Sequence, residues 1–182
     1  MRFCFLTLLI SIIGCKQPEA KQRVISPIHT SIPEGAMIAD FLGNQDSLYA
    51  YVKEIDFPNQ TTYIGFEDDR MPSISIPESI GAKLQVLKLN NFSQEVLLIN
   101  ATPVDTNFNE YYLFVWNDSL WTEPVNRFDI HKSNMSDTLT VLTDDPRDST
   151  KILRYYSVFD MDSKSEKKYS WKLMRESVVI EK

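Results

Sequence analysis

Acidic residues near the C-terminus are spaced so that they could bind a metal ion. They lie in the stretch FDMDSKSEKKYSW, residues 159–171, which contains Asp160, Asp162 and Glu166. Calcium prefers about six to eight oxygen ligands, and acids at alternate positions of one loop can converge on it. The stretch has no glycine for a sharp turn, and its lysines would repel a cation. We therefore predict a solvated hairpin turn and no bound metal, and we keep a calcium site as the alternative.

Other residues that could do chemistry form no recognisable catalytic motif. The acidic clusters Glu67-Asp68-Asp69 and Asp144-Asp145 could supply the paired carboxylates that glycoside hydrolysis needs. Neighbouring strand residues point to opposite faces, so these clusters do not form a site by themselves. The two histidines, His29 and His131, are far apart in the sequence and are interpreted as surface residues. We predict no catalytic residue and no cofactor, with a hydrolase that uses loop carboxylates as the alternative.

The N-terminus has the organisation of a secretory signal peptide. Arg2 supplies a positive charge, and the apolar run 3–13 is shorter than the roughly 20 residues of a membrane-spanning helix. The run ends in Ile12-Ile13-Gly14-Cys15, which resembles the lipobox of bacterial lipoproteins. The resemblance implies that residues 1–14 are removed and that Cys15 carries a diacylglycerol thioether. The alternative is a buried first strand with an incidental cysteine.

The residues after Cys15 bear on location. In enterobacteria an aspartate after the lipidated cysteine favours retention in the inner membrane, and here the residue is Lys16. The resemblance therefore implies an outer-membrane lipoprotein, and residues 16–19 are similar to the surface-export signals of Bacteroidota lipoproteins. Two or more acyl chains anchor firmly, because each buried methylene contributes about 0.8 kcal/mol. The first expected partner is thus the membrane, and periplasmic and surface-facing locations both stay open.

Charge and cysteine content disfavour several classes of protein. The formal net charge is −6 and no cluster of lysine and arginine stands out, which argues against nucleic-acid binding. Of the two cysteines, Cys4 lies in the predicted signal peptide and Cys15 at the predicted lipidation site. The mature chain would then have no disulfide, thiolate metal site or cysteine nucleophile. Its core must be held by packing alone.

The elements that position these residues are predicted to be strands. Segments rich in β-branched and aromatic residues are bounded by Asn, Asp, Pro or Gly. They are 47–56, 61–68, 73–77, 82–90, 95–101, 109–116, 120–125, 138–143, 151–160 and 168–174. The continuous apolar run 95–101 is typical of a central strand buried on both faces. Segment 168–174 alternates, with Tyr169, Trp171 and Leu173 on one face.

These segments predict a mainly β fold. We expect a signal peptide at 1–14, a lipidated N-terminus and proline-rich tether at 15–34, and a single β domain at 35–182. The domain is too short for a closed propeller of at least four blades. We therefore predict an antiparallel sandwich or a partial propeller-like sheet pair. Helical spacing is faint and confined to residues 35–42, and a three-residue connection, 117–119, is expected to join two strands as a hairpin.

Two segments form a degenerate repeat. ADFLGNQDSLYAYV begins at Ala39 and LKLNNFSQEVLLI at Leu87, and each is predicted to be a short strand, a polar loop and a hydrophobic strand. Both resemble degenerate FG-GAP or VCBS-type repeats, in which loop carboxylates chelate calcium. Here Leu42, Lys88 and Phe92 stand where that family has oxygen ligands. We therefore predict a scaffold that keeps the turn without the metal.

Aromatic residues are the best candidates for a binding surface. They concentrate in the predicted hairpin 111–121, as Tyr111, Tyr112, Phe114, Trp116 and Trp121. Successive strand residues alternate in direction, so both faces carry rings, and an exposed face could stack on sugars or anchor a protein. The alternative, which we favour, is that these rings form the core.

Together these patterns predict an envelope lipoprotein with a non-catalytic binding or structural role. Its expected partners are the membrane, through the lipid on Cys15, and a glycan or an envelope protein, with the 111–121 hairpin as the expected contact surface. A surface glycan-binding accessory lipoprotein is the first alternative. The hydrolase described above is the second.

Overall fold

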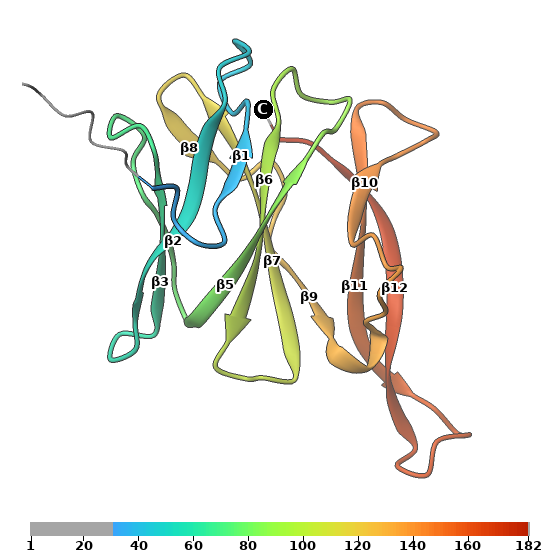
Figure 1. Ribbon diagram of the computed structural model, residues 1–182. Coiled ribbons are helices and arrows are strands. Elements are labelled where there is room, and N and C mark those ends of the chain that lie inside the picture. Colours follow the sequence, from blue (N-terminus) through green and yellow to red (C-terminus); the bar gives the residue numbers. More distant parts are fainter. Residues whose placement is uncertain (1–30, 182) are drawn as a thin grey trace, which may run out of the picture. The chain divides into compact units, whose positions relative to one another are not determined.

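Antiparallel strands make up nearly all the regular structure in the computed structural model, which describes residues 31–181. The signal peptide, Cys15 and His29 lie outside the described residues. Three antiparallel sheets are present, and the predicted mainly β fold class is confirmed (Figure 1). The helical content between 31 and 181 is one short 3-10 turn, η1 (Lys132–Asn134). No helix in this part of the chain is long and apolar enough to cross a membrane.

The first sheet is a meander of four strands. Its order is β1 (Met37–Ala39), β2 (Leu48–Asp56), β3 (Thr61–Phe66) and β4 (Ile74–Ile76). Each strand is antiparallel to its neighbour, and a register shift lies between Val52 and Glu54. Along β4 the buried Ile74 and Ile76 flank an exposed Ser75. This alternation is typical of a sheet with one covered face.

The second sheet is the centre of the molecule's core. It contains β5 (Ser79–Leu87), β6 (Val96–Pro103), β7 (Phe108–Asn117) and β8 (Leu120–Thr122) in that order. A fifth strand, β9 (Phe128–His131), pairs with the N-terminal part of β7, whereas β8 pairs with its C-terminal end. The long strands β6 and β7 therefore run through the middle of this sheet.

The third sheet is formed by the C-terminal strands. It consists of β10 (Leu142–Asp144), β11 (Lys151–Met161) and β12 (Tyr169–Val179) in that order. β11 and β12 pair from Lys151 opposite Val179 to Met161 opposite Tyr169, with no register shift. The end of this hairpin extends beyond the other strands (Figure 1).

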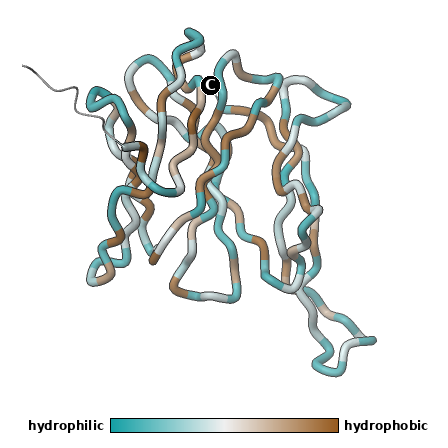
Figure 2. Tube along the Cα trace, viewed as in Figure 1, coloured by the Kyte–Doolittle hydropathy of each residue, from teal (hydrophilic) through white to brown (hydrophobic). Residues whose placement is uncertain are grey.

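Both faces of the central sheet are buried. Along β6, Leu97 and Ile99 belong to the cluster shared with the first sheet, whereas Val96 and Leu98 belong to the cluster shared with the third. Because strand side chains alternate in direction, a continuous apolar run can fill both clusters at once. The prediction that 95–101 is buried on both faces is confirmed, and hydrophobic residues concentrate along these strands in Figure 2.

Two N-terminal and central predictions differ in detail from the structure. Residues 35–42 form β1 and its flanking turns instead of a helical turn, because Met37 to Ala39 pair with β2. The connection after β7 has two residues, since Asn117 pairs with Leu120. Asp118 and Ser119 both have positive φ, 47° and 110°, which a two-residue hairpin with the right twist requires.

The C-terminal half also departs from the prediction in two places. Strand β9 was not predicted, because a four-residue strand carries too little alternation to stand out. Segment 138–143 was predicted as a strand, but β10 begins only at Leu142. The residues before it form turns, with a hydrogen bond from the Leu139 N–H to the Ser136 carbonyl.

Candidate functional site

A row of aromatic rings runs along one face of the β11–β12 hairpin and onto the central sheet. We call it the aromatic strip and define it by Tyr169, Phe159, Trp171, His131 and Phe108. Ring centroids are 5.2 Å apart from Tyr169 to Phe159, from Phe159 to Trp171 and from Trp171 to His131. The Phe108 ring lies 4.9 Å from Trp171, edge to face. Ring contacts therefore continue from the hairpin to β7 and β9.

Strand register places the outer rings on one face. Phe159 lies opposite Trp171, and Met161 lies opposite Tyr169. Opposed residues of an antiparallel pair point to the same side and stand close enough for their side chains to touch. The alternation in the sequence predicted the shared face of Tyr169 and Trp171, and the register adds Phe159 and Met161 to that face.

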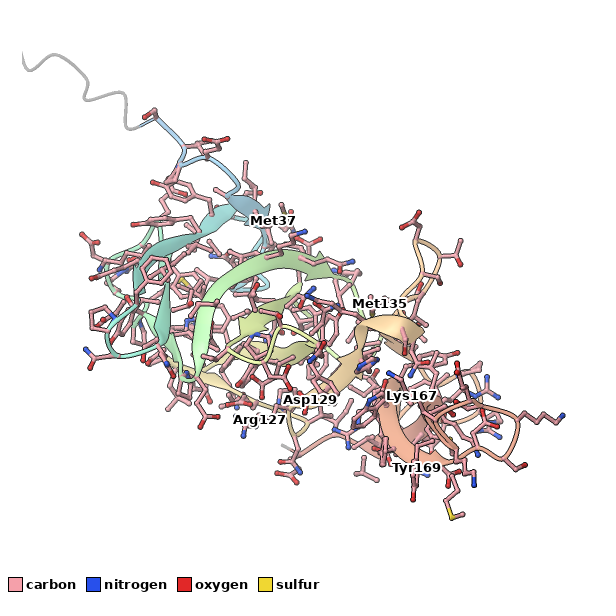
Figure 3. The ribbon with its side chains drawn as sticks, turned by 90° about the horizontal axis from the view of Figure 1, so that it is seen from below. Met37, Arg127, Asp129, Met135, Lys167 and Tyr169 are labelled. Carbon is pink, nitrogen blue, oxygen red and sulfur yellow. The ribbon has the colours of Figure 1, made fainter. Side chains whose placement is uncertain are left out.

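The outer end of the strip is open to solvent. The side chains of Phe159, Met161 and Tyr169 are 59%, 73% and 49% exposed. Trp171 and the inner rings are half-buried. Figure 3 shows Tyr169 on the extending hairpin, near Lys167 of its turn. The strip thus changes from half-buried rings at its inner end to an exposed apolar surface at its outer end.

Hydrogen bonds fix the base of the hairpin beside β9. The backbone N–H of His131 and the side-chain amide of Asn134 each donate to the Ser157 hydroxyl, at 2.9 Å. The His131 Nδ1 atom also lies 2.7 Å from the Ser133 hydroxyl. Since Ser157 precedes Phe159 by two residues on β11, these bonds hold the inner rings in place and orient the outer ones.

Charged groups lie on the opposite face of the hairpin. The Lys172 ammonium is 2.5 Å from a carboxylate oxygen of Asp160. The hydrogen bond from Lys172 lowers the pKa of Asp160, and the same bond raises the pKa of Lys172. Both residues alternate with the ring-bearing positions, so they point away from the strip. The hairpin therefore has one charged face and one aromatic face.

The structure does not bring together the acids of the alternative calcium site. Asp160 accepts hydrogen bonds from Lys172 and from the Met161 N–H. Asp162 accepts one from the Lys164 N–H at 3.0 Å, which shapes the turn, and Glu166 lies exposed beyond it. Between residues 31 and 181, no three Asp, Glu, His or Cys side chains are close enough to hold a metal ion. Asp160 and Asp162 instead stabilise the hairpin and its turn.

The predicted contact surface 111–121 is mostly interior. Tyr111, Tyr112 and Phe114 are buried, and Trp116 and Trp121 pack partly buried against the first cluster. The Trp121 ring stacks on Phe66 of β3 with centroids 4.6 Å apart. Two flanking sheets cover β7, so the structure supports the core alternative. It leaves no exposed ring face at the first three positions.

The loops of the degenerate repeat are joined by hydrogen bonds. The Asp40 carboxylate accepts bonds from the backbone N–H groups of Asn44 and Gln45, at 3.1 and 3.0 Å. The Asp40 N–H donates to the Glu95 carboxylate at 2.8 Å, and the Glu95 N–H donates to the Asp40 carbonyl. The acids left in these two loops therefore hold the turns and bind them to each other.

The two acidic clusters are also engaged in local structure. Hydrogen bonds from Arg70 lower the pKa of Asp68 to about 2. Asp144 accepts bonds from the backbone and side chain of Asn90, at 2.9 and 2.8 Å. Asp145 is buried and accepts a bond from Ser177, which lowers its pKa. In each case the carboxylate shapes a turn or joins two segments.

Sequence reasoning missed an ionic network on the central sheet, in which Glu110 and Tyr112 are buried and Arg127 is half-exposed. The Arg127 guanidinium lies 3.2 Å from the Glu110 carboxylate and donates to the Tyr112 hydroxyl at 3.2 Å. Burial raises the pKa of Glu110, and it raises the pKa of Tyr112 to about 12. A charged residue within an otherwise apolar strand signals a buried pair, and Glu110 at the start of the run before Tyr111 is such a residue.

A cleft of about 700 Å³ opens between β8 and the C-terminal end of β12. Phe92, Val115 and Ile180 give it an apolar lining, and Glu123 and Glu181 line it with carboxylates. Burial raises the pKa of Glu123. This hollow is separate from the aromatic strip.

Comparison with known proteins adds no relative. No protein-family model, curated protein or solved structure matches this chain. The function is therefore inferred from the sequence and from the aromatic strip.

Proposed function

We propose that this chain is a lipid-anchored, non-catalytic binding protein of the bacterial envelope, with the outer aromatic strip as its contact surface. The observation that carries the proposal is the exposure of Phe159, Met161 and Tyr169. Full burial of such a side chain would stabilise the folded state by about 1.5–3 kcal/mol, and these three side chains are too exposed in this fold to contribute that much. Contiguous exposed apolar side chains in soluble domains mark sites of interaction.

The chemistry of the strip favours a protein over a glycan as the partner. Protein interfaces are enriched in aromatic residues and methionine. Phe159 and Met161 present no group that could bind a sugar hydroxyl, and the hydrogen-bonding groups of Asp160 and Lys172 point to the other face. The strip thus offers apolar anchors without the polar groups that orient a sugar.

A glycan remains the second candidate because of one geometric feature. The rings of Phe159 and Tyr169 are nearly parallel, with 15° between their planes. Partly exposed parallel rings can stack on sugar rings, and the Tyr169 hydroxyl adds one hydrogen-bonding group.

The membrane anchor rests on the lipobox resemblance at Cys15. Its test is independent of the strip: the Cys15→Ala variant should move from the outer-membrane fraction to the soluble fraction. Incorporation of a labelled fatty acid into the natural chain, and not into the variant, is the second expected result. If the natural chain takes up no label, the anchor is rejected while binding through the strip still stands.

Site-specific photo-crosslinking in intact cells tests the contact surface. A photoreactive amino acid is placed at position 161, and a matched control carries it at Phe57, which is 64% exposed in the β2–β3 connection. We expect position 161 to give a discrete protein adduct that position 57 does not give. The proposal fails if both positions give the same products or if position 161 gives none.

Tryptophan fluorescence separates the two candidate ligands. Trp171 is the half-buried member of the strip, whereas Trp116 and Trp121 pack against the core. A protein partner predicts no saturable quenching by envelope polysaccharides. Saturable quenching that disappears in Trp171→Phe would instead assign the strip to a glycan.

A further inference from the structure

Strand β12 is an open sheet edge. It is the last strand of the third sheet, and no strand within residues 31–181 pairs with its outer side; just past its end, the Glu181 N–H donates to the Pro124 carbonyl. It runs for 11 residues and pairs with β11 without a register shift. Proteins protect long edges with prolines, bulges or charged side chains; β12 has no proline or bulge, and its charged residues are Lys172, Arg175 and Glu176. An edge of this length is a template for another strand whose charges complement these three.

Two hydrogen bonds, one at the turn and one at the end of β12, show which residues direct their backbone N–H and C=O groups toward β11 and which direct them outward. The Asp162 N–H donates to the Lys168 carbonyl, and the Ile180 N–H donates to the Thr150 carbonyl. Alternate residues of an antiparallel strand direct their N–H and C=O groups to the same neighbour. Even-numbered residues therefore bond to β11, and odd-numbered residues from Tyr169 to Val179 direct theirs outward.

We infer that β12 is a homodimer interface, in which the β12 strands of two copies pair antiparallel about a two-fold axis at Met174. A strand that pairs with itself along its full length must have its middle residue opposite itself. For Tyr169–Val179 that residue is Met174. The outward backbone groups of the odd-numbered residues then pair with each other throughout, from Tyr169 opposite Val179 onward.

The side chains of β12 complement themselves in this register. Its three exposed large apolar residues are Tyr169, Met174 and Val179. Met174 meets Met174 of the second copy, and Tyr169 meets Val179. Lys172 meets Glu176, so opposite charges face each other on both sides of the axis. Aromatic–β-branched pairs and opposite-charge pairs are the cross-strand combinations that stabilise sheets.

Neighbouring registers lose this complementarity. Two copies of β12 that pair about a two-fold axis have side chains of the same sheet face opposite each other when the axis lies midway between the two copies of one residue. The neighbouring registers therefore centre the axis on Arg175 or on Leu173. Moving the axis to Arg175 places two arginines opposite each other and Met174 opposite Glu176. Moving it to Leu173 places Lys172 opposite Met174. The full-length register places Leu173 opposite Arg175, and of the three registers it is the one that pairs Lys172 with Glu176.

The ion pairs between β11 and β12 within each copy continue the charge complementarity of the proposed interface. Within one copy, Lys172 bonds to Asp160, and Glu176 is 2.5 Å from Arg154 of β11. Pairing Lys172 with Glu176 of the second copy gives a row in which charges alternate in sign across four strands. Tyr169 pairs with Val179 of the second copy, whereas Phe159 and Met161 lie on β11, away from the new strand pair, so this part of the proposed contact surface stays available. The inference therefore does not depend on the proposed function.

Disulfide trapping of the full chain tests the register. Directly opposed residues have Cα atoms about 4.5–5.5 Å apart, within the roughly 4.4–6.8 Å that a disulfide spans. Met174→Cys should therefore form a covalent dimer under mild oxidation. Ser170→Cys is the matched control on the same strand face, because its two copies would be roughly 27 Å apart at about 3.4 Å per residue. The natural chain, with Cys4 and Cys15, gives the background.

Charge reversal provides a second test by sedimentation equilibrium. Lys172→Glu places like charges opposite each other twice and should weaken dimerisation about tenfold. A variant that combines Lys172→Glu and Glu176→Lys with Asp160→Lys and Arg154→Glu restores opposite charges between the copies and within each copy, and should recover the dimer. The inference is overturned if Met174→Cys cross-links no more than Ser170→Cys, or if it cross-links to a different protein instead of to itself. A natural chain that sediments as a monomer also overturns it.

Discussion

Replacing Phe114 and Phe159 by alanine, one at a time, separates a ring that holds the core from a ring that is presented to solvent. Phe114 is 7% exposed and packs in the cluster between the first two sheets, parallel to the Tyr112 ring. Removal of a buried phenylalanine side chain costs about 3–5 kcal/mol, from lost burial and from the cavity that remains. We expect Phe114→Ala to lower the free energy of unfolding by this amount.

The expected loss at Phe159 is much smaller. Its side chain is 59% exposed, so less than half of a full burial contribution of about 1.5–3 kcal/mol is at stake. Its contacts with Tyr169 and Trp171 lie at an open end, where the remaining side chains can adjust. We expect Phe159→Ala to lower the free energy of unfolding by about 1 kcal/mol, while cross-linking through position 161 is lost.

Urea unfolding followed by tryptophan fluorescence measures both losses. With a slope of about 1–3 kcal/mol per molar urea, Phe114→Ala should lower the midpoint by more than about 1 M. Phe159→Ala should move it by less than half as much. If Phe114→Ala does not fold, the milder Phe114→Leu takes its place and should still cost more than Phe159→Ala. Equal losses at the two positions would refute the assignment of the first ring to the core and the second to a contact surface.

Three further predictions concern the turn after β7, the ionic network and the loop of β1. Ser119→Gly should raise the free energy of unfolding by about 0.5–1 kcal/mol in the same urea assay, because glycine adopts its positive φ of 110° without strain; an unchanged midpoint would argue against strain there. Glu110 has a raised pKa, so the folded protein keeps the proton on this carboxyl group to a higher pH than the unfolded chain does. The contribution of Glu110 to the free energy of unfolding is therefore fully present below the ordinary pKa of 4.5. It is lost as the pH rises through the raised pKa of the folded state. Glu110→Gln should therefore gain stability relative to the natural chain as the pH rises from the ordinary pKa of 4.5 through the raised pKa, and a difference independent of pH would contradict this. Asp40→Ala removes the acceptor of two backbone N–H groups and should cost about 1–2 kcal/mol, with Asp40→Asn losing less; equal effects of the two variants would show that the carboxylate is not the acceptor that matters.

The fold was largely predictable because its strands carry strong patterns. The run 95–101 indicated a strand buried on both faces, and the structure places it between two other sheets. Short elements were missed for the opposite reason. β1 and β9 have too few residues for a period to appear, and each forms because a longer neighbour, β2 or β7, offers an edge to it.

The candidate site was less predictable, since aromatic content does not reveal which rings are covered. The rings of 111–116 form a continuous apolar run like 95–101, and the third sheet buries the face that could have been open. The continuous apolar run at 111–116 was therefore a sign in the sequence that both faces of this strand are buried. For 168–174 the alternation gave the correct shared face of Tyr169 and Trp171. The alternation could not show that the end of the β11–β12 hairpin extends beyond the other strands, which leaves Phe159 and Tyr169 exposed.

The extension of this hairpin is the feature that folding alone does not explain. The inner half of β11 fills the second cluster with buried residues such as Ile152, and that contribution ends before Phe159. Beyond Phe159, one face of the hairpin exposes apolar side chains. The edge of β12 that faces away from β11 has no strand paired to it within residues 31–181. A shorter or more polar hairpin would cover the central sheet equally well and would carry less risk of non-specific association. The two proposed contacts would use the additional length: the rings on β11 and at the start of β12 would bind a partner, and the outer edge of β12 would bind a second copy.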